Sequence, residues 1–193
     1  MQYVLTPYSD ISPSYCFWEK GFSEEELDWL QDRATNSSER GIVNLEGSAE
    51  EHCDIRRSDL SWMYNEPETN WVYERIADIA SSLNSKFYRF DLSGFGEAIQ
   101  MTNYSSEEEG KYEWHQDCGA KISRKISLVL QLSNPDEYEG GELQIFNESQ
   151  ITTMKKDRGY LIAFPSYTMH QVTPVTSGNR QSLVTWLSGP AFR

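Results

Sequence analysis

Two stretches in the first half of the chain place their apolar residues at helical spacing. The first follows a capping box formed by Ser23 and Glu26, and Leu27 and Leu30 supply its apolar contacts. The second is predicted to begin near Pro67, with apolar positions spaced by four, three and four residues at Val72, Ile76, Ile79 and Leu83. Neither stretch carries an obvious reactive group, so both predict a helical brace that packs against a sheet.

From Phe87 onward the apolar residues alternate with polar ones, as they do in strands with one buried face. The first predicted strand divides its residues between two faces, with Ala98, Gln100, Thr102 and Tyr104 on one and Ile99 and Met101 on the other. Later strands are predicted at 126–132, 143–145, 160–164 and 180–187, with Gly, Pro and Asn between them. This succession predicts a mainly β fold, a sandwich or barrel of jelly-roll type braced by the N-terminal α-helices.

The change of pattern near Phe87 also divides the chain into two regions. Residues 1–86 are predicted to form the helical brace, integrated with the core, and residues 87–193 to form the jelly-roll core. A chain of 193 residues fits a single structural domain. Residues 36–55 and 105–110 are polar and lack periodicity, so both segments are predicted to be loops.

The charge and the cysteines narrow the choice of partners and location. The net charge is −13, from 30 acidic and 17 basic residues, which disfavours nucleic acid and anionic membranes as partners. A local basic groove is the alternative, around Arg56, Arg57, Lys121, Arg124 and Lys125. The chain shows no apolar run of membrane-spanning length and no secretion signal, and its three cysteines are far apart, which predicts reduced thiols and an intracellular, cytoplasmic protein. No pattern predicts the oligomeric state.

Two of the three histidines are placed as a metal site would need them. His115 and Asp117 are two residues apart, so in an extended strand both side chains project to the same side and can chelate one ion. His170 must then arrive from a distant strand, which a jelly roll allows. Two imidazoles and one carboxylate form the facial triad that holds Fe(II) with neighbouring coordination positions open.

Arg180, ten residues after His170, supplies a cation that suits an acidic co-substrate. A guanidinium binds a carboxylate with two parallel hydrogen bonds, and its charge does not titrate away. Ser182 and Trp186 share its strand face, and Ser182 is a second hydrogen-bond donor there. An exposed surface arginine is the alternative. The polar face that carries Gln100 and Tyr104 predicts a lined cavity, although a solvent-facing strand has the same pattern.

Four segments in this order resemble the 2-oxoglutarate/Fe(II)-dependent oxygenases, and most closely the prolyl 4-hydroxylase-like branch of PKHD-type hydroxylases. They are Tyr104, the run 112–117, Gly140-Gly141-Glu142-Leu143, and the stretch from Phe164 through His170 to Arg180. The resemblance covers roughly residues 87 to 190. It departs from the family at 130–132, where several prolyl hydroxylases have a tyrosine and this chain reads Leu-Gln-Leu.

The resemblance implies a double-stranded β-helix with iron on His115, Asp117 and His170. It also implies that 2-oxoglutarate chelates the iron while its distal carboxylate meets Arg180. Tyr104 matches a tyrosine that contacts the co-substrate in relatives. We therefore expect the co-substrate site to comprise Arg180, Tyr104, Ser182 and Gln100, and the substrate pocket to be walled by Trp186 and Trp114.

The activity implied is hydroxylation of a C–H bond with O2, in which 2-oxoglutarate is decarboxylated to succinate, and L-ascorbate is a further expected cofactor. Related halogenases lack the carboxylate ligand, so the presence of Asp117 favours hydroxylation. The expected substrate is a prolyl or other side chain of a peptide or protein. The alternatives are a free small molecule, or a non-catalytic metal-binding jelly roll that serves as an interaction module. A zinc hydrolase is disfavoured because the chain has no H-E-x-x-H sequence.

The predicted loops at 105–110 and 36–53 are candidates for a rim over which substrate approaches. The first contains three consecutive glutamates, Glu107 to Glu109, which would favour a basic or neutral substrate. The alternative is that these glutamates only solvate a turn.

Overall fold

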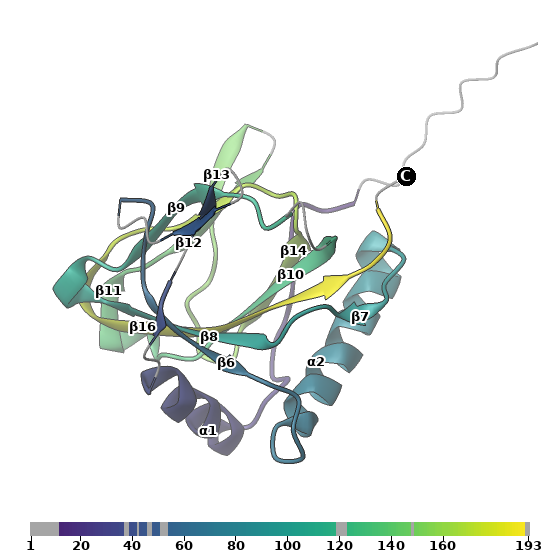
Figure 1. Cartoon of the computed structure of the whole chain (residues 1–193), viewed down its shortest axis with the longest axis horizontal. Coiled ribbons are helices and arrows are strands. Elements are labelled where there is room, and N and C mark those ends of the chain that lie inside the picture. The colour runs from purple at the N-terminus through teal and green to yellow at the C-terminus, as the bar shows by residue number, and fades with distance from the viewer. Residues whose placement is uncertain are drawn as a thin grey trace, which may run out of the picture.

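The computed structural model describes residues 12–36, 39–41, 43–45, 48–50, 54–118, 123–147 and 149–191. Two antiparallel sheets face one another, and helices α1 (Glu24–Thr35) and α2 (Asn70–Leu83) lie against the outer side of the larger sheet (Figure 1). The fold is mainly β and of jelly-roll type, as the alternating pattern predicted. Within the described residues, no helix has the length and apolar character needed to cross a membrane.

The larger sheet contains nine strands. Its main path, in spatial order, is β1 (Cys16–Trp18), β14 (Leu161–Pro165), β10 (Arg124–Gln131), β16 (Val175–Ser188), β8 (Ile99–Ser105), β6 (Asp59–Met63) and β2 (Glu39–Arg40). Two further strands, β7 (Gly94–Phe95) and β11 (Tyr138–Gly140), pair with β16. The long β16 therefore connects most of the sheet.

The smaller sheet has five strands and lies opposite the larger one. In spatial order they are β13 (Gln150–Thr153), β12 (Leu143–Asn147), β15 (His170–Val172), β9 (Lys111–His115) and β5 (Arg56–Arg57). The remaining elements are the hairpin of β3 (Val43–Leu45) and β4 (Ser48–Glu50), a π-helical turn at Asn84–Tyr88, and short 3-10 turns at Ser106–Glu108 and Pro135–Glu137.

The two helices form largely as the sequence pattern predicts. Glu26 N–H donates to Ser23 Oγ at 3.3 Å, and Ser23 N–H donates to Glu26 Oε2 at 2.9 Å, so the predicted capping box is confirmed. The second helix begins at Asn70 rather than near Pro67. The reason is a turn held by Thr69, whose hydroxyl donates to Tyr64 O at 2.6 Å and accepts from the Glu66 N–H at 2.8 Å.

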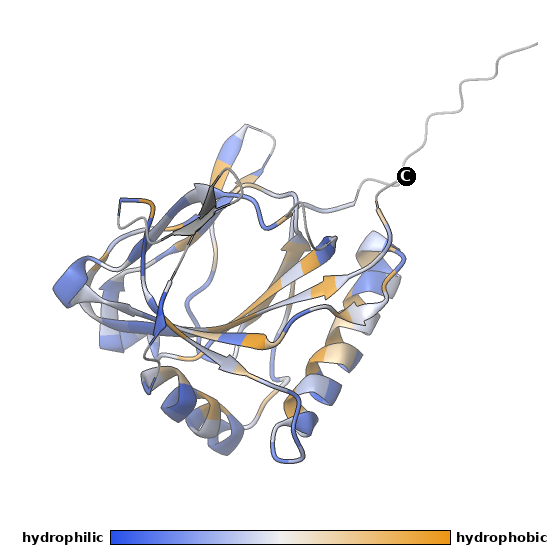
Figure 2. Ribbon diagram, viewed as in Figure 1, coloured by the Kyte–Doolittle hydropathy of each residue, from blue (hydrophilic) through white to orange (hydrophobic). Residues whose placement is uncertain are grey.

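Two hydrophobic clusters hold the layers together. One lies between the helices and the larger sheet and includes Leu30, Ile76 and Met101, and the other lies between the two sheets and includes Ile145 and Phe164. Figure 2 shows hydrophobic residues along the strands of the larger sheet and on parts of α1 and α2. The second cluster fills only part of the space between the sheets.

The N-terminal third contributes strands as well as helices, which differs from the predicted helical brace. β1 pairs with β14, β6 with β8 and β5 with β9, so residues before Phe87 extend both sheets. These strands have two to five residues, too few to show a clear alternation. The predicted loop at 36–55 likewise contains β2 and the β3–β4 hairpin, while 37–38, 42, 46–47 and 51–53 lie outside the described residues. The division at Phe87 stays a prediction.

Gly140, at the end of β11, is a position where a side chain should strongly destabilise the fold. Its φ is +72°, and an added Cβ would lie 2.1 Å from the Pro174 carbonyl oxygen, which is backbone and cannot move aside cheaply. We expect Gly140→Ala to lower the free energy of unfolding by about 2–4 kcal/mol, measured by urea denaturation.

Gly159→Ala is the matched control for this prediction. Gly159 has a similar φ of +77°, but an added Cβ would approach only the flexible Leu27 side chain, at 3.1 Å. Gly159→Ala should lower the free energy of unfolding only by the strain of the left-handed backbone, about 1–2 kcal/mol. Equal losses in the two variants would show that the contact with Pro174 is unimportant.

Candidate active site

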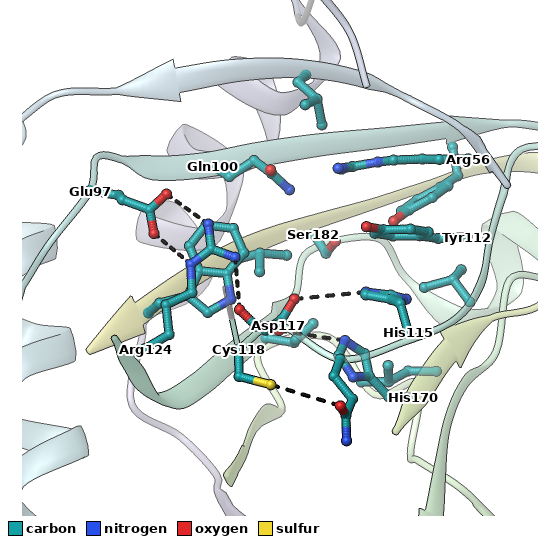
Figure 3. A pocket seen from close by; sticks show the side chains of 18 of the residues that line it. Arg56, Glu97, Gln100, Tyr112, His115, Asp117, Cys118, Arg124, His170 and Ser182 are labelled. Carbon is teal, nitrogen blue, oxygen red and sulfur yellow. Dashed lines mark hydrogen bonds and ion pairs between the residues drawn. The ribbon is translucent and has the colours of Figure 1, made fainter. Parts of the chain in front are cut away.

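A cavity of about 530 Å³ opens between the two sheets (Figure 3). Its lining brings together eight residues that the sequence singled out: Gln100, Tyr104, His115, Asp117, His170, Arg180, Ser182 and Trp186. They come from β8, β9, β15 and β16 and from the segment after β9. The sheets therefore place residues from positions 100 to 186 around one space.

The two histidines lie on neighbouring strands of the smaller sheet. His115 ends β9 and His170 begins β15, and the two residues are directly opposite in the antiparallel register. Asp117 follows two residues after His115, with its Oδ1 3.7 Å from His115 Nε2 and its Oδ2 3.5 Å from His170 Nε2. One ligand atom from each of the three residues falls within 4.8 Å of the others.

Backbone carbonyl groups fix the orientation of both imidazoles. His115 Nδ1 is 2.7 Å from Glu113 O, and His170 Nδ1 is 2.9 Å from Thr168 O. Each Nδ1 therefore carries the proton and donates it to the carbonyl, which leaves the Nε2 lone pair free. Both Nε2 atoms are the ones nearest the Asp117 carboxylate, so all three ligand atoms converge.

The protonation states also suit metal binding. Burial and the nearby His170 lower the pKa of His115 to about 3, so this imidazole is neutral near pH 7. Burial alone would raise the pKa of Asp117, but the neighbouring His170 and His115, with the hydrogen bond from Ser127, outweigh it and lower the pKa to about 2. A neutral imidazole and an ionised carboxylate are the forms that bind a metal.

Further hydrogen bonds hold Asp117 in place. Ser127 Oγ donates to Asp117 Oδ2 at 2.7 Å, and the Asp117 N–H donates to Ser166 O at 2.9 Å. Arg124 Nη1 donates to the Asp117 carbonyl oxygen at 3.3 Å. The donor set of two imidazole nitrogens and one carboxylate oxygen, fixed in this way at the cavity wall, fits Fe(II) with positions left open toward the cavity.

We expect Ser127→Ala to weaken metal binding by about 10- to 100-fold, because the hydroxyl orients the carboxylate ligand. Metal affinity can be measured by competition with a chelator. Ser133→Ala is the matched control, since Ser133 is also buried but its hydroxyl contacts only the backbone of Asn179 and Gln181. If Ser127→Ala binds metal as tightly as Ser133→Ala does, Ser127 does not support the site.

Arg180 lines the cavity and is only 1% exposed. Its Nη2 donates to Gln131 Oε1 at 3.0 Å, its Nη1 lies 3.5 Å from Ser182 Oγ, and its buried Nε has no hydrogen-bond partner. Among the described residues, no carboxylate oxygen lies within 4.0 Å of this guanidinium. A buried cation with a free donor and no anion is a fitting site for the carboxylate of a ligand.

Gln100, Tyr104 and Trp186 complete this side of the cavity. The Tyr104 ring centroid is 5.4 Å from Arg180 Cζ, and Gln100 Nε2 donates to Thr102 Oγ1 at 2.9 Å. Trp186 is 5% exposed and lies under the Arg124 guanidinium, with 3.8 Å between Arg124 Cζ and the ring. Gln100 and Tyr104 lie on the polar strand face that the sequence predicted, and Trp186 lies on the same strand as Arg180.

Trp114 is not among the residues that line this cavity, so its predicted place in the substrate pocket stays a prediction. Its ring packs edge-on against Phe146 instead. Adjacent residues of a strand project to opposite sides, and its neighbour His115 faces the cavity, so Trp114 must face away. Gln131 lies in the 130–132 stretch, where the sequence departs from the family resemblance. Its side chain accepts a hydrogen bond from Arg180 and thereby orients the guanidinium.

Sequence reasoning did not assign several residues of the lining to the site. Tyr112 stacks on His115 with 3.5 Å between ring centroids, and Arg124 binds the Glu97 carboxylate through two hydrogen bonds of 2.6 Å each. Arg56 also lines the cavity. Arg56 and Arg124 belong to the suggested basic groove, of which Lys121 lies outside the described residues. Strand periodicity could not reveal the place of Arg56, because β5 has only two residues. The number of basic residues in the sequence was the available signal for these arginines.

The cavity combines a two-histidine, one-carboxylate cluster with a buried arginine, and comparisons with known proteins show what this chain is similar to. A model of the 2OG-Fe(II) oxygenase superfamily matches residues 99–188. A PKHD-type hydroxylase of Cupriavidus pinatubonensis is 34% identical over 159 residues, which cover 82% of this chain and 66% of that protein. The chain is therefore similar to the 2OG-Fe(II) oxygenase superfamily over residues 99–188 and to a PKHD-type hydroxylase over most of its length.

Solved structures share the fold. A prolyl-4-hydroxylase of Pseudomonas putida superposes with a TM-score of 0.72 at 18% identity, covering 93% of this chain and 94% of that one. A prolyl hydroxylase from Trichoplax adhaerens, in complex with a hypoxia inducible factor oxygen degradation domain peptide fragment, gives a TM-score of 0.72 at 15% identity, covering 91% and 84%. The chain spans just under two thirds of the Cupriavidus protein and 32% of a second PKHD-type hydroxylase.

Proposed function

We propose that this protein is an Fe(II)- and 2-oxoglutarate-dependent dioxygenase that hydroxylates a C–H bond, with decarboxylation of 2-oxoglutarate to succinate. The observation that carries the proposal is one cavity that holds both the three converging ligand atoms of His115, Asp117 and His170 and the buried guanidinium of Arg180. A non-catalytic metal-binding module would not need the buried guanidinium of Arg180. The non-catalytic alternative is therefore disfavoured.

Each of the chain's own groups has a distinct part in this proposal. Bound Fe(II), with 2-oxoglutarate and O2, supplies the oxidising power that C–H hydroxylation needs. His115 and His170 bind through Nε2, and Asp117 binds through its carboxylate. Arg180 takes the distal carboxylate of 2-oxoglutarate, with Gln131 and Ser182 holding the guanidinium and Tyr104 beside it. The low exposure of these groups keeps bulk water from competing.

A prolyl or other side chain of a peptide or protein is the proposed substrate. Its support is the match to PKHD-type hydroxylases and the shared fold with a prolyl hydroxylase that was solved with a peptide. A free small molecule remains the second candidate, because the cavity of about 530 Å³ accommodates one. Two of the three glutamates of the 105–110 loop do not direct this choice. Glu108 pairs with Arg40 and Glu109 pairs with Arg57, so their charge is offset within the protein.

A substrate panel tests this proposal. The protein would be supplied with Fe(II), 2-oxoglutarate and O2, with ascorbate as the reductant that keeps iron as Fe(II), and offered proline-containing peptides and free amino acids in parallel. We expect succinate formation above the substrate-free rate with a subset of peptides, and a product heavier by one oxygen atom. Succinate stimulated only by free amino acids would assign the second candidate. No oxygenated product from any panel member would contradict hydroxylation of these classes.

An intracellular location belongs to the proposal as well. Cys16 and Cys118 are free thiols among the described residues, which fits a reducing compartment. The absence of nucleic acid and membrane partners, expected from the net charge of −13, stays a prediction.

A further inference from the structure

The cavity is cationic although the chain as a whole is acidic. The net charge of the chain is −13, yet the charged residues of the lining are three arginines and two acids: Arg56, Arg124, Arg180, Glu97 and Asp117. A cluster of positive groups inside an acidic protein focuses attraction for anions on this one site. The partners of these five charged side chains show which cation remains available to bind a ligand.

Four of the five charges are already accounted for. Glu97 and Arg124 neutralise each other through two hydrogen bonds of 2.6 Å (Figure 3). Asp117 belongs to the ligand cluster with the two histidines. Arg180 faces the co-substrate in the proposed function. Within the described part of the chain, Arg56 alone of these cations has no assigned anion.

Arg56 is built into the wall and held rigidly. It is 7% exposed, its Nε donates to Ser58 Oγ at 2.9 Å, and its Cζ lies 4.7 Å from the centroid of the Tyr112 ring. Gly41 packs against it so closely that an added Cβ would be 2.7 Å from Arg56 Nε. Among the described residues no carboxylate lies within 4.0 Å of its guanidinium, which leaves the two Nη groups free to bind a ligand.

The position of Arg56 places such a ligand next to the metal-ligand cluster. Tyr112 stacks on His115, and Figure 3 shows Arg56, Tyr112 and His115 one above another, with Gln100 and Arg56 pointing toward each other across the cavity. An anion bound by Arg56 would therefore lie one aromatic ring away from His115.

We propose that Arg56 binds a carboxylate of the primary substrate, so that the substrate is an anion. This inference rests on the proposed function, since it assigns Arg180 to 2-oxoglutarate. A planar guanidinium with two free Nη groups matches a carboxylate in a bidentate pair. The carboxylate has two sources, a free small acid or an acidic residue of a peptide, and the same chemistry recognises both.

Matched acids and amides test the proposal by binding rather than by turnover. The protein, loaded with Mn(II) and 2-oxoglutarate without O2, would be titrated calorimetrically with acetate and acetamide, then with N-acetylproline and its amide. A third pair is a blocked proline–aspartate dipeptide and its proline–asparagine counterpart. We expect the acid of at least one pair to bind at least about tenfold more tightly than its amide. The pair that responds identifies the source of the carboxylate.

Variants of two adjacent arginines sharpen the test. Arg56→Gln should abolish the preference for the acid. Arg56→Lys keeps the positive charge but lacks the planar guanidinium, so it should retain part of the preference. Arg57→Gln is the matched control, because Arg57 binds Glu109 and the Glu108 carbonyl oxygen and does not line the cavity. It should leave the preference unchanged. The melting temperature of each variant shows whether the fold is retained.

Equal binding of acid and amide in every pair by the wild-type protein, including no binding of either, would overturn the proposal whatever the variants do. A preference that survives in a folded Arg56→Gln variant would also overturn it. The proposed function fails separately, if the Mn(II)-loaded wild-type protein does not bind 2-oxoglutarate when it is loaded before these titrations.

Discussion

Replacing His170 by alanine should weaken Fe(II) binding by more than about 100-fold, a larger loss than removal of an orienting group causes. His170 supplies one of only three ligand atoms, and its Nε2 is aimed at the site by the Thr168 carbonyl group. Alanine leaves two ligands, His115 at the end of β9 and Asp117 in the segment after it, which hold Fe(II) weakly. Binding is measured by equilibrium dialysis of Fe(II) without O2.

Glu113→Gln is the control for this variant. Glu113 lies on the same strand as His115, and its exposed side chain pairs with Lys111. The substitution keeps the carbonyl group that orients His115, so Fe(II) affinity should stay within about twofold of wild type. Stoichiometric, tight Fe(II) binding by His170→Ala would remove this histidine from the metal site.

Arg180→Gln should weaken 2-oxoglutarate binding by about 100-fold while the metal stays bound, because loss of a buried charge-assisted pair costs about 3 kcal/mol. Arg180 is 1% exposed and has an unsatisfied Nε, so water cannot replace the missing guanidinium well. The affinity is measured by calorimetry on the Mn(II)-loaded protein. Mn(II) binding is the internal control.

Gln131→Leu tests the same carboxylate-binding role of Arg180 through the residue that holds its guanidinium. Gln131 Oε1 accepts from Arg180 Nη2, so its loss should misplace the guanidinium and reduce 2-oxoglutarate affinity by an intermediate factor of about tenfold. An affinity near that of wild type in Arg180→Gln would mean that the co-substrate carboxylate is bound elsewhere in the cavity.

The sequence predicted the parts of the fold that depend on local pattern. The capping box at Ser23 and the alternation along β8 are local, so helix α1 and the polar face of Gln100 and Tyr104 could be read directly. His115 and Asp117 could be paired for the same reason, since both belong to one short segment. Assigning roles to His170 and Arg180 also required the order of several motif segments along the chain.

What the sequence could not predict depends on contacts between distant segments. Arg56 enters the cavity because β5 pairs with β9, opposite Tyr112, and a two-residue strand carries no periodicity that would reveal this. Gln131 contacts Arg180 only because β10 lies beside β16. The large ring of Trp114 suggested a pocket wall, but the ring packs against Phe146 outside the lining of this cavity, and strand alternation beside His115 is the signal that could have shown this.

The most direct test of the central claim is the release of labelled CO2 from 2-oxoglutarate carrying carbon-14 at C1. The wild-type protein should release labelled CO2 and form succinate in equal amounts, and only when Fe(II) and O2 are both supplied. His170→Ala should release none above background. The account would be contradicted if the wild-type protein, with Fe(II) bound, released no labelled CO2, or if His170→Ala released it at the wild-type rate.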